Sequence, residues 1–108
     1  MSDLPNEIFR KWQHSFEEDA DGVTVYRPTE YSFPRARGRA GIEFGPEGKF
    51  TEWMIGPADA QRGVPGQWTV EAPVGIRISF PQPNAAARTL EIVHLDQGVL
   101  KVRLRTTP

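Results

Sequence analysis

Ten glycines and ten prolines stand at short intervals along this chain of 108 residues, and they limit the folds open to it. Proline breaks helices because it lacks the amide hydrogen, and glycine destabilises them because it loses the most backbone freedom on folding. The apolar segments between these residues are short, and several alternate apolar with polar residues, which is the period of a half-buried strand. The sequence therefore predicts many short strands joined by turns, and no long amphipathic helix.

These strands are expected to pair as antiparallel hairpins, because a parallel sheet needs crossover helices that the sequence does not indicate. Glycine and proline mark the turns, most clearly at Gly45-Pro46-Glu47-Gly48. Antiparallel strands in this order close into a barrel or form a sandwich, and the hairpin spacing favours an all-β, short up-and-down barrel of about eight strands. We expect strands over residues 11–16, 23–26, 39–44, 49–55, 67–71, 76–80, 88–95 and 99–105, after a short N-terminal helix over residues 3–10.

Length, charge and cysteine content narrow the classes further. Residues 1–108 fit a single domain. The net charge is -1, with 13 basic and 14 acidic residues, so we expect neither nucleic acid nor an anionic membrane as a partner. There is no cysteine, which excludes disulfides, thiolate catalysis and cysteine-based zinc sites. The polar N-terminus lacks the apolar core of a signal peptide, and the predicted location is therefore cytoplasmic.

The order of several motifs resembles the small bacterial lipocalin-like domains of the calycin type. Trp12 stands in the first strand, Phe50 follows the glycine turn, and the triplet Gly66-Gln67-Trp68 opens a later strand. A leucine-rich hairpin over residues 90–104 ends the similarity, which covers residues 10–105. The resemblance implies a barrel whose wider group binds small apolar molecules and includes a few enzymes. It also implies that a Trp–Arg contact closes one end, with Arg103 and Arg105 near Trp12.

Alternation assigns one face of each strand to the interior, and three ionisable residues fall on that face. His14 and His94 alternate with apolar neighbours, and Glu52 joins them if Phe50 and Met54 point inward. Histidine and glutamate in an apolar site transfer protons near neutral pH, which makes the three residues candidate catalytic acids and bases. The alternative is that both histidines are hydrogen-bonded structural residues. We expect no metal site, since one needs three or four ligands.

Arg35, Arg37 and Arg39 form a small basic cluster in an irregular segment. The arginine fork suits bidentate binding of a carboxylate, so these residues are candidates to hold a ligand's acidic group. They are equally suited to pair with an acidic turn close by in the chain. That turn consists of Glu17, Glu18, Asp19 and Asp21.

Three functions are consistent with the sequence, and none requires a cofactor. The first is binding of a small apolar or aromatic molecule, with or without a carboxylate, against Trp53, Trp68 and Phe80 in the barrel mouth. The second is a cofactorless isomerase, cyclase or hydrolase that uses the interior histidines and glutamate. The third is an interaction module in which a free strand edge or residues 28–38 dock a partner or a second copy, giving a homodimer.

Overall fold

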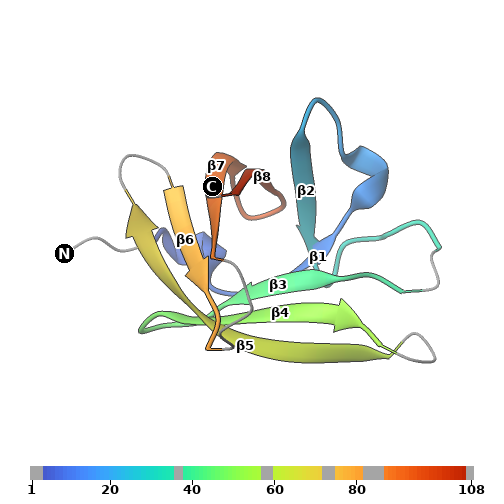
Figure 1. Ribbon diagram of the computed structural model, residues 1–108. Helices are drawn as coiled ribbons and strands as arrows, with labels where there is room; N and C mark the ends of the chain where they lie inside the picture. The colour runs from blue at the N-terminus through green and yellow to red at the C-terminus, as the bar shows by residue number, and fades with distance from the viewer. Residues whose placement is uncertain (1–3, 36–37, 57–59, 72–74, 82–86, 107–108) are drawn as a thin grey trace.

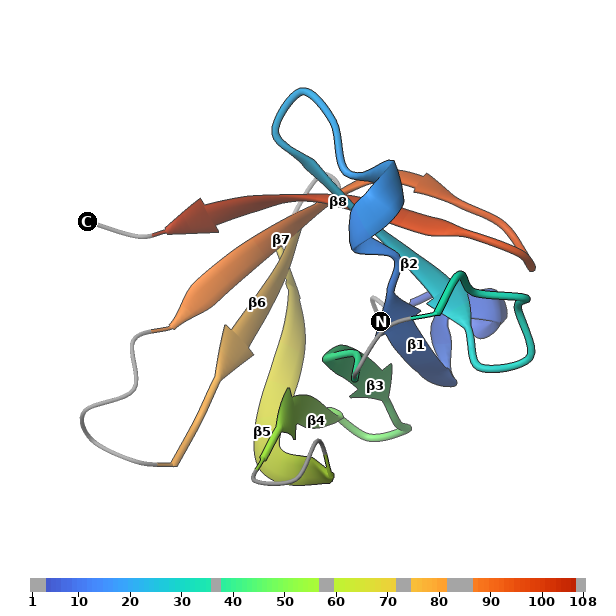
Figure 2. The same ribbon diagram turned by 90° about the vertical axis from the view of Figure 1, so that its right-hand side faces the viewer.

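Eight antiparallel strands close into a barrel in the computed structural model, which describes residues 4–35, 38–56, 60–71, 75–81 and 87–106 (Figure 1, Figure 2). This confirms the predicted fold class. The elements in chain order are η1 (Asn6–Ile8), β1 (Lys11–His14), η2 (Phe16–Glu18), β2 (Val23–Pro28), β3 (Gly41–Phe44), β4 (Lys49–Ile55), β5 (Gln61–Glu71), β6 (Gly75–Ser79), β7 (Arg88–Leu95) and β8 (Leu100–Thr106).

The strands follow each other around the barrel as a meander from β3 to β8. The barrel closes through the N-terminal hairpin, because β2 pairs with β8 and β1 pairs with both β2 and β3. Each strand therefore has two hydrogen-bonded neighbours. The short helix expected over residues 3–10 is a single 3₁₀ turn, in which the Phe9 amide donates to the carbonyl of Asn6, and residue 3 lies outside the described residues.

Left-handed backbone makes two tight turns, one of them in the β3–β4 hairpin, where the sequence predicted a turn. Glu47 has φ 60° and Gly48 has φ 80° in that turn, and Gly48 adopts this conformation without a Cβ clash. The β1–β2 connection repeats the device at Asp21 and Gly22, with φ of 55° and 77°. Aspartate and glycine are among the residues that enter this region most readily.

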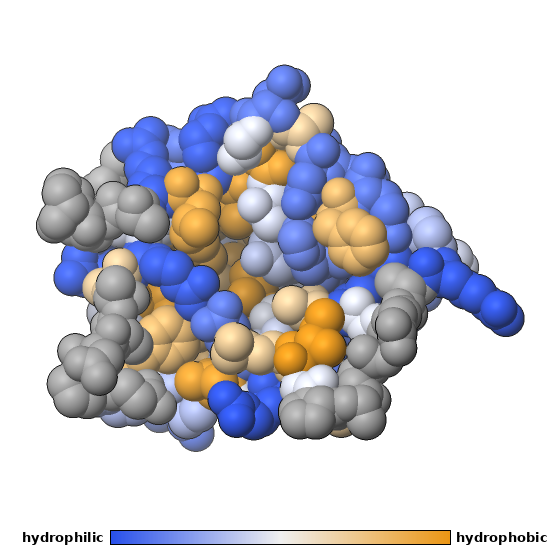
Figure 3. Space-filling view, turned by 45° about the vertical axis from the view of Figure 1, so that its right-hand side comes forward, coloured by the Kyte–Doolittle hydropathy of each residue, from blue (hydrophilic) through white to orange (hydrophobic). Residues whose placement is uncertain are grey.

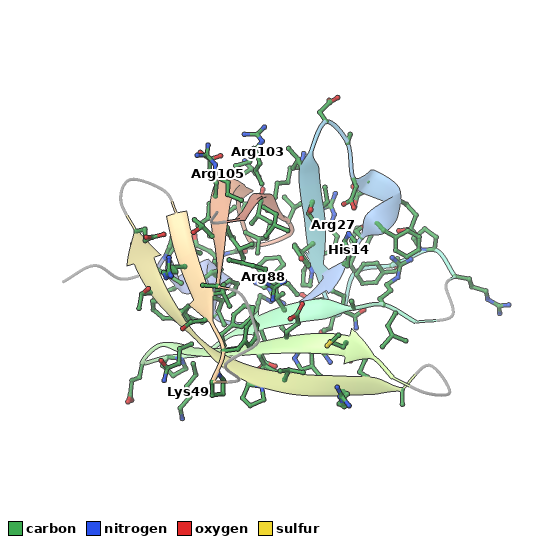
Figure 4. All side chains as sticks on the ribbon, viewed as in Figure 1. His14, Arg27, Lys49, Arg88, Arg103 and Arg105 are labelled. Carbon is green, nitrogen blue, oxygen red and sulfur yellow. The ribbon has the colours of Figure 1, made fainter. Side chains whose placement is uncertain are left out.

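The N-terminal segment closes one end of the barrel, which we call the closed end. Ile8 and Trp12 are fully buried, and the Trp12 Nε1 donates a hydrogen bond of 3.0 Å to the Ile8 carbonyl. The Arg10 guanidinium lies 5.5 Å from the centroid of the Trp12 ring. The prediction that Arg103 and Arg105 stack near Trp12 is wrong. Both lie on the outer face of β8, towards its C-terminal end, and pair with Glu91 (Figure 4).

Candidate functional site

We call the opposite end of the barrel the mouth. β1, β4, β6 and β8 end there, and β7 begins there. A cavity of about 50 Å³, the mouth cavity, lies inside it. Figure 3 shows this face, with hydrophobic residues recessed between hydrophilic ones. The cavity is lined by Thr24, Tyr26, Ile42, Phe50, Ile78, Arg88, Leu90, Val102 and Leu104.

An ion pair between Arg88 and Glu52 crosses the interior at the mouth. Arg88 Nη2 donates to Glu52 Oε1 at 2.7 Å, and Nη1 donates to Oε2 at 3.2 Å. Both side chains point inward, because Arg88 is in register with buried Ile78 and Glu52 with buried Ile42. Each side chain is 28% exposed. The pair joins β4 to β7, which lie on opposite sides of the interior (Figure 2, Figure 4).

An aromatic ring supports the arginine of this pair. The Phe80 ring lies 5.2 Å from the Arg88 guanidinium carbon and packs edge-on to Phe50 at 6.1 Å. Gly66 makes room for it, since a Cβ at that position would come within 2.9 Å of two Phe80 ring carbons. Phe80 therefore lies beside the ion pair at the mouth, although it is not among the residues that line the mouth cavity.

Tyr26 presents a polar group to the mouth cavity. Burial raises the pKa of its phenol to about 12, so the group is a neutral hydrogen-bond donor throughout the physiological range. Its hydroxyl makes no hydrogen bond to any described residue. A cavity-facing hydroxyl without a protein partner is open to a ligand or to water.

His14 lies next to Tyr26, with the two ring centroids 5.5 Å apart. Its Nε2 is 2.8 Å from Asp19 Oδ2, and the Val25 amide donates to the other oxygen of the same carboxylate. Asp19 thereby fixes the orientation of the imidazole. Of the three predicted acid–base residues, His14 and Glu52 thus lie on the inward face near the mouth.

His94, the third of these residues, is not inside. Its side chain is 53% exposed, and its Nε2 lies 2.9 Å from Asp96 Oδ2. The register shifts between Ile92 and His94, and such a bulge reverses the alternation on which the prediction depended. The hydrogen bond with His94 lowers the pKa of Asp96, whose carboxylate also accepts from the turn amides of Gly98 and Val99.

Two of the three aromatic residues predicted to bind a ligand lie elsewhere. Trp53 is on the outer face, where its Nε1 donates to Glu43 and the Lys11 ammonium lies 4.2 Å from its ring centroid. Trp68 is inside the barrel but at the closed end, where its Nε1 donates to the carbonyl of Gly45 in the β3–β4 turn. Neither residue reaches the mouth cavity.

Of the arginine cluster, Arg39 pairs with Glu17 of the acidic turn, which was the structural alternative. Arg39 is 8% exposed, and its guanidinium donates to Glu17 and to two backbone carbonyls. The guanidinium also lies over the rings of Phe16 and Phe33. The hydrogen bond from Arg39 lowers the pKa of Glu17. Arg35 is exposed on the surface, and Arg37 lies outside the described residues.

Sequence reasoning missed Arg88 and Tyr26 as site residues. Arg88 carried a usable signal, because it stands two and four residues before Leu90 and Ile92, which alternation assigns to the interior. A charged residue at such a position is rarely buried unless it is paired. Its partner Glu52 is 36 residues away in the chain, and the sequence does not reveal that contact.

Comparison with known proteins adds no assignment: no family model, curated protein or solved structure matches the chain. The described part of the chain holds no group of three or more His, Cys, Asp or Glu side chains able to bind a metal ion. No helix within the described ranges has the length and apolar character needed to span a membrane. Among the described residues, the arrangement at the mouth is a mainly apolar cavity with the hydroxyls of Tyr26 and Thr24 and one internally paired arginine.

Proposed function

We propose that this protein is a lipocalin-like binding protein that takes a small, mainly apolar molecule into the mouth cavity. The Tyr26 hydroxyl carries the proposal, because it faces a mainly apolar cavity and has no described protein partner. Ligand sites are typically concave and apolar, with a few polar groups that fix orientation. An exposed apolar rim supports the same function, since Leu104 and Met54 on the inward faces of β8 and β4 are 47% and 45% exposed.

The cavity volume limits how much of the ligand is enclosed. About 50 Å³ is several times the roughly 10–15 Å³ that one water needs, and less than the roughly 150 Å³ of a cavity known to bind benzene. One end of a ligand therefore enters the cavity, and the rest lies between the apolar residues of the rim. Met54 suits this position because its unbranched side chain adapts to different shapes.

The contact between His14 and Asp19 favours a second candidate, a cofactorless enzyme that transfers a proton at the mouth. A carboxylate that orients an imidazole is a recurring feature of acid–base catalysis. His94 has no part in this candidate, because its side chain is on the surface. The interaction module stays a prediction: each strand has two neighbours, but residues 61–66 of β5 pair with β4 and not with β6. A homodimer and a cytoplasmic location stay predictions.

Nuclear magnetic resonance tests the binding function directly, with benzyl alcohol as the probe. We expect its addition to shift the signals of Tyr26, Arg88 and Leu104 at the mouth and to leave Trp68 at the closed end unchanged. Leu104→Trp should abolish the shifts by filling the rim. Val93→Trp is the matched control, because Val93 is 44% exposed and lies at the bulge of β7, away from the residues lining the cavity. Equal shifts in both variants, or shifts centred away from the mouth, would overturn the proposal.

A further inference from the structure

The charge of Arg88 is already neutralised within the protein. Arg88 is the one charged side chain among the described residues that line the mouth cavity, and two hydrogen bonds join it to Glu52. Bidentate pairs of this kind are among the strongest hydrogen-bonded contacts in proteins. The other acidic group close to Tyr26, Asp19, is paired with His14.

This pairing disfavours a charged ligand of either sign. A ligand carboxylate that approaches Arg88 meets the carboxylate of Glu52 beside it, and a ligand ammonium that approaches Glu52 meets Arg88. Both groups are largely shielded from solvent. Charge interactions in such a shielded position are stronger than in bulk water. An uncharged ligand avoids both repulsions and leaves the ion pair intact.

The free hydroxyl of Tyr26 identifies the polar group that an uncharged ligand would offer. A neutral phenol both donates and accepts one hydrogen bond, so it can bind an alcohol, a phenol or a carbonyl oxygen. The remaining lining residues, other than Thr24 and Arg88, are apolar and suit a ring or a short chain.

We infer that the mouth site selects uncharged ligands that carry one alcohol, phenol or carbonyl oxygen, and that Glu52 sets this selectivity by neutralising Arg88. The inference rests on the proposed binding function and adds to it the class of ligand and the residue that determines it. Glu52 acts as a specificity-determining residue: without it, Arg88 presents an unpaired charge to the cavity and the site becomes an anion site.

Three probes with the same ring and different charges test this inference: benzyl alcohol, benzoate and benzylamine, titrated by nuclear magnetic resonance at pH 7. The natural protein should bind benzyl alcohol at least about tenfold more tightly than either ion, a ratio that corresponds to about 1.4 kcal/mol. Glu52→Gln should reverse the order and favour benzoate by about tenfold. Arg88→Gln leaves Glu52 unpaired and should favour benzylamine instead.

Two further variants test whether the change in charge acts only at the mouth and whether the Tyr26 hydroxyl binds the ligand. Glu43→Gln changes the net charge by the same amount on the outer face, where Glu43 accepts from Trp53, and should leave the order of affinities unchanged. Tyr26→Phe should weaken benzyl alcohol binding until it matches toluene. Amide spectra identify which variants are folded, and because Glu52→Gln and Arg88→Gln are expected to switch in opposite directions, either folded variant decides the question.

The outcomes distinguish the two proposals. If benzoate binds the natural protein as tightly as benzyl alcohol, or if either folded variant keeps the natural order, the selectivity inference is wrong and the binding function stands. If none of the three probes shifts the mouth signals of the natural protein or of the folded variants, the binding function itself fails.

Discussion

Glu18 makes the stability of this protein depend on acid pH. Arg27 donates to both of its carboxylate oxygens at 2.9 and 2.7 Å, and the Ser15 hydroxyl donates at 2.7 Å. These hydrogen bonds lower the pKa of Glu18 from 4.5 to about 2. Because the folded state favours the carboxylate, the stabilisation is fully present above pH 4.5 and is lost as the pH falls towards 2.

The size of this contribution follows from the shift and from the exposure of the side chain. The full shift would amount to roughly 3 kcal/mol at 1.36 kcal/mol per pKa unit. Glu18 is 33% exposed, and solvent screening reduces the expected contribution to about 1 kcal/mol. We therefore expect Glu18→Gln to lower the free energy of unfolding by about 1 kcal/mol at neutral pH.

Urea denaturation at pH 7 and near pH 2.5 measures this dependence. Near pH 2.5 almost all of Glu18 in the unfolded state is protonated, and roughly a quarter of it in the folded state. Only about a quarter of the contribution at neutral pH is left, so the difference between the natural protein and the variant should shrink to a few tenths of a kcal/mol. Glu7→Gln is the control, because Glu7 is exposed and its change should leave unfolding within about 0.5 kcal/mol. A difference for Glu18→Gln that is equal at both pH values would refute the reasoning.

Three further substitutions should destabilise the protein, each measured by urea denaturation at pH 7. Arg39→Lys loses the planar fork that binds Glu17 between two aromatic rings and should cost about 1–2 kcal/mol. Gly41→Ala drives a Cβ into the Trp12 carbonyl oxygen and should cost about 2 kcal/mol or more, whereas Gly75→Ala meets only ordinary contacts and should cost under about 1 kcal/mol. Trp12→Phe leaves a buried carbonyl without its indole donor and should cost about 1–3 kcal/mol, and a cost near zero would show that the N-terminal segment does not depend on that bond.

Alternation predicted the interior correctly wherever a strand runs without interruption. Ile76 and Ile78 on β6, Leu90 on β7 and Val102 on β8 are all buried as expected, because successive side chains of a strand point to opposite faces. The rule fails where the strand geometry stops. A strand over residues 11–16 would turn Phe16 to the same face as His14. β1 instead ends at His14 and Phe16 begins the 3₁₀ turn η2, which leaves its side chain 47% exposed.

Trp53 shows why the sequence did not decide which face of β4 points inward. The strand has large apolar residues on both faces, and period two does not rank them. Trp53 pairs across the sheet with Gly41 and Gly63, and a Cβ on Gly63 would come 3.1 Å from its ring. The ring therefore covers a glycine of the neighbouring strand from outside, and that partnership depends on strand order, which alternation does not determine.

The candidate site was only partly predictable for the same reason. His14, Glu52 and Phe80 follow from parity along single strands, whereas the contact of Glu52 with Arg88 joins β4 to β7 across the interior. Pairings of this kind depend on how the barrel closes. A sequence pattern assigns each residue a face, but it does not place two inward charges opposite each other.

The pairs that Arg27 and Arg39 make with the acidic turn have a clear structural role. Arg27 and Arg39 hold the acidic turn against β2 and the irregular segment that follows it. The Arg88–Glu52 pair instead occupies a position beside an apolar cavity, where apolar residues of similar size would pack as stably or better. Packing alone therefore gives no reason for two charges at that position. A ligand whose approach they select gives one, and the free hydroxyl of Tyr26 lies in the same cavity.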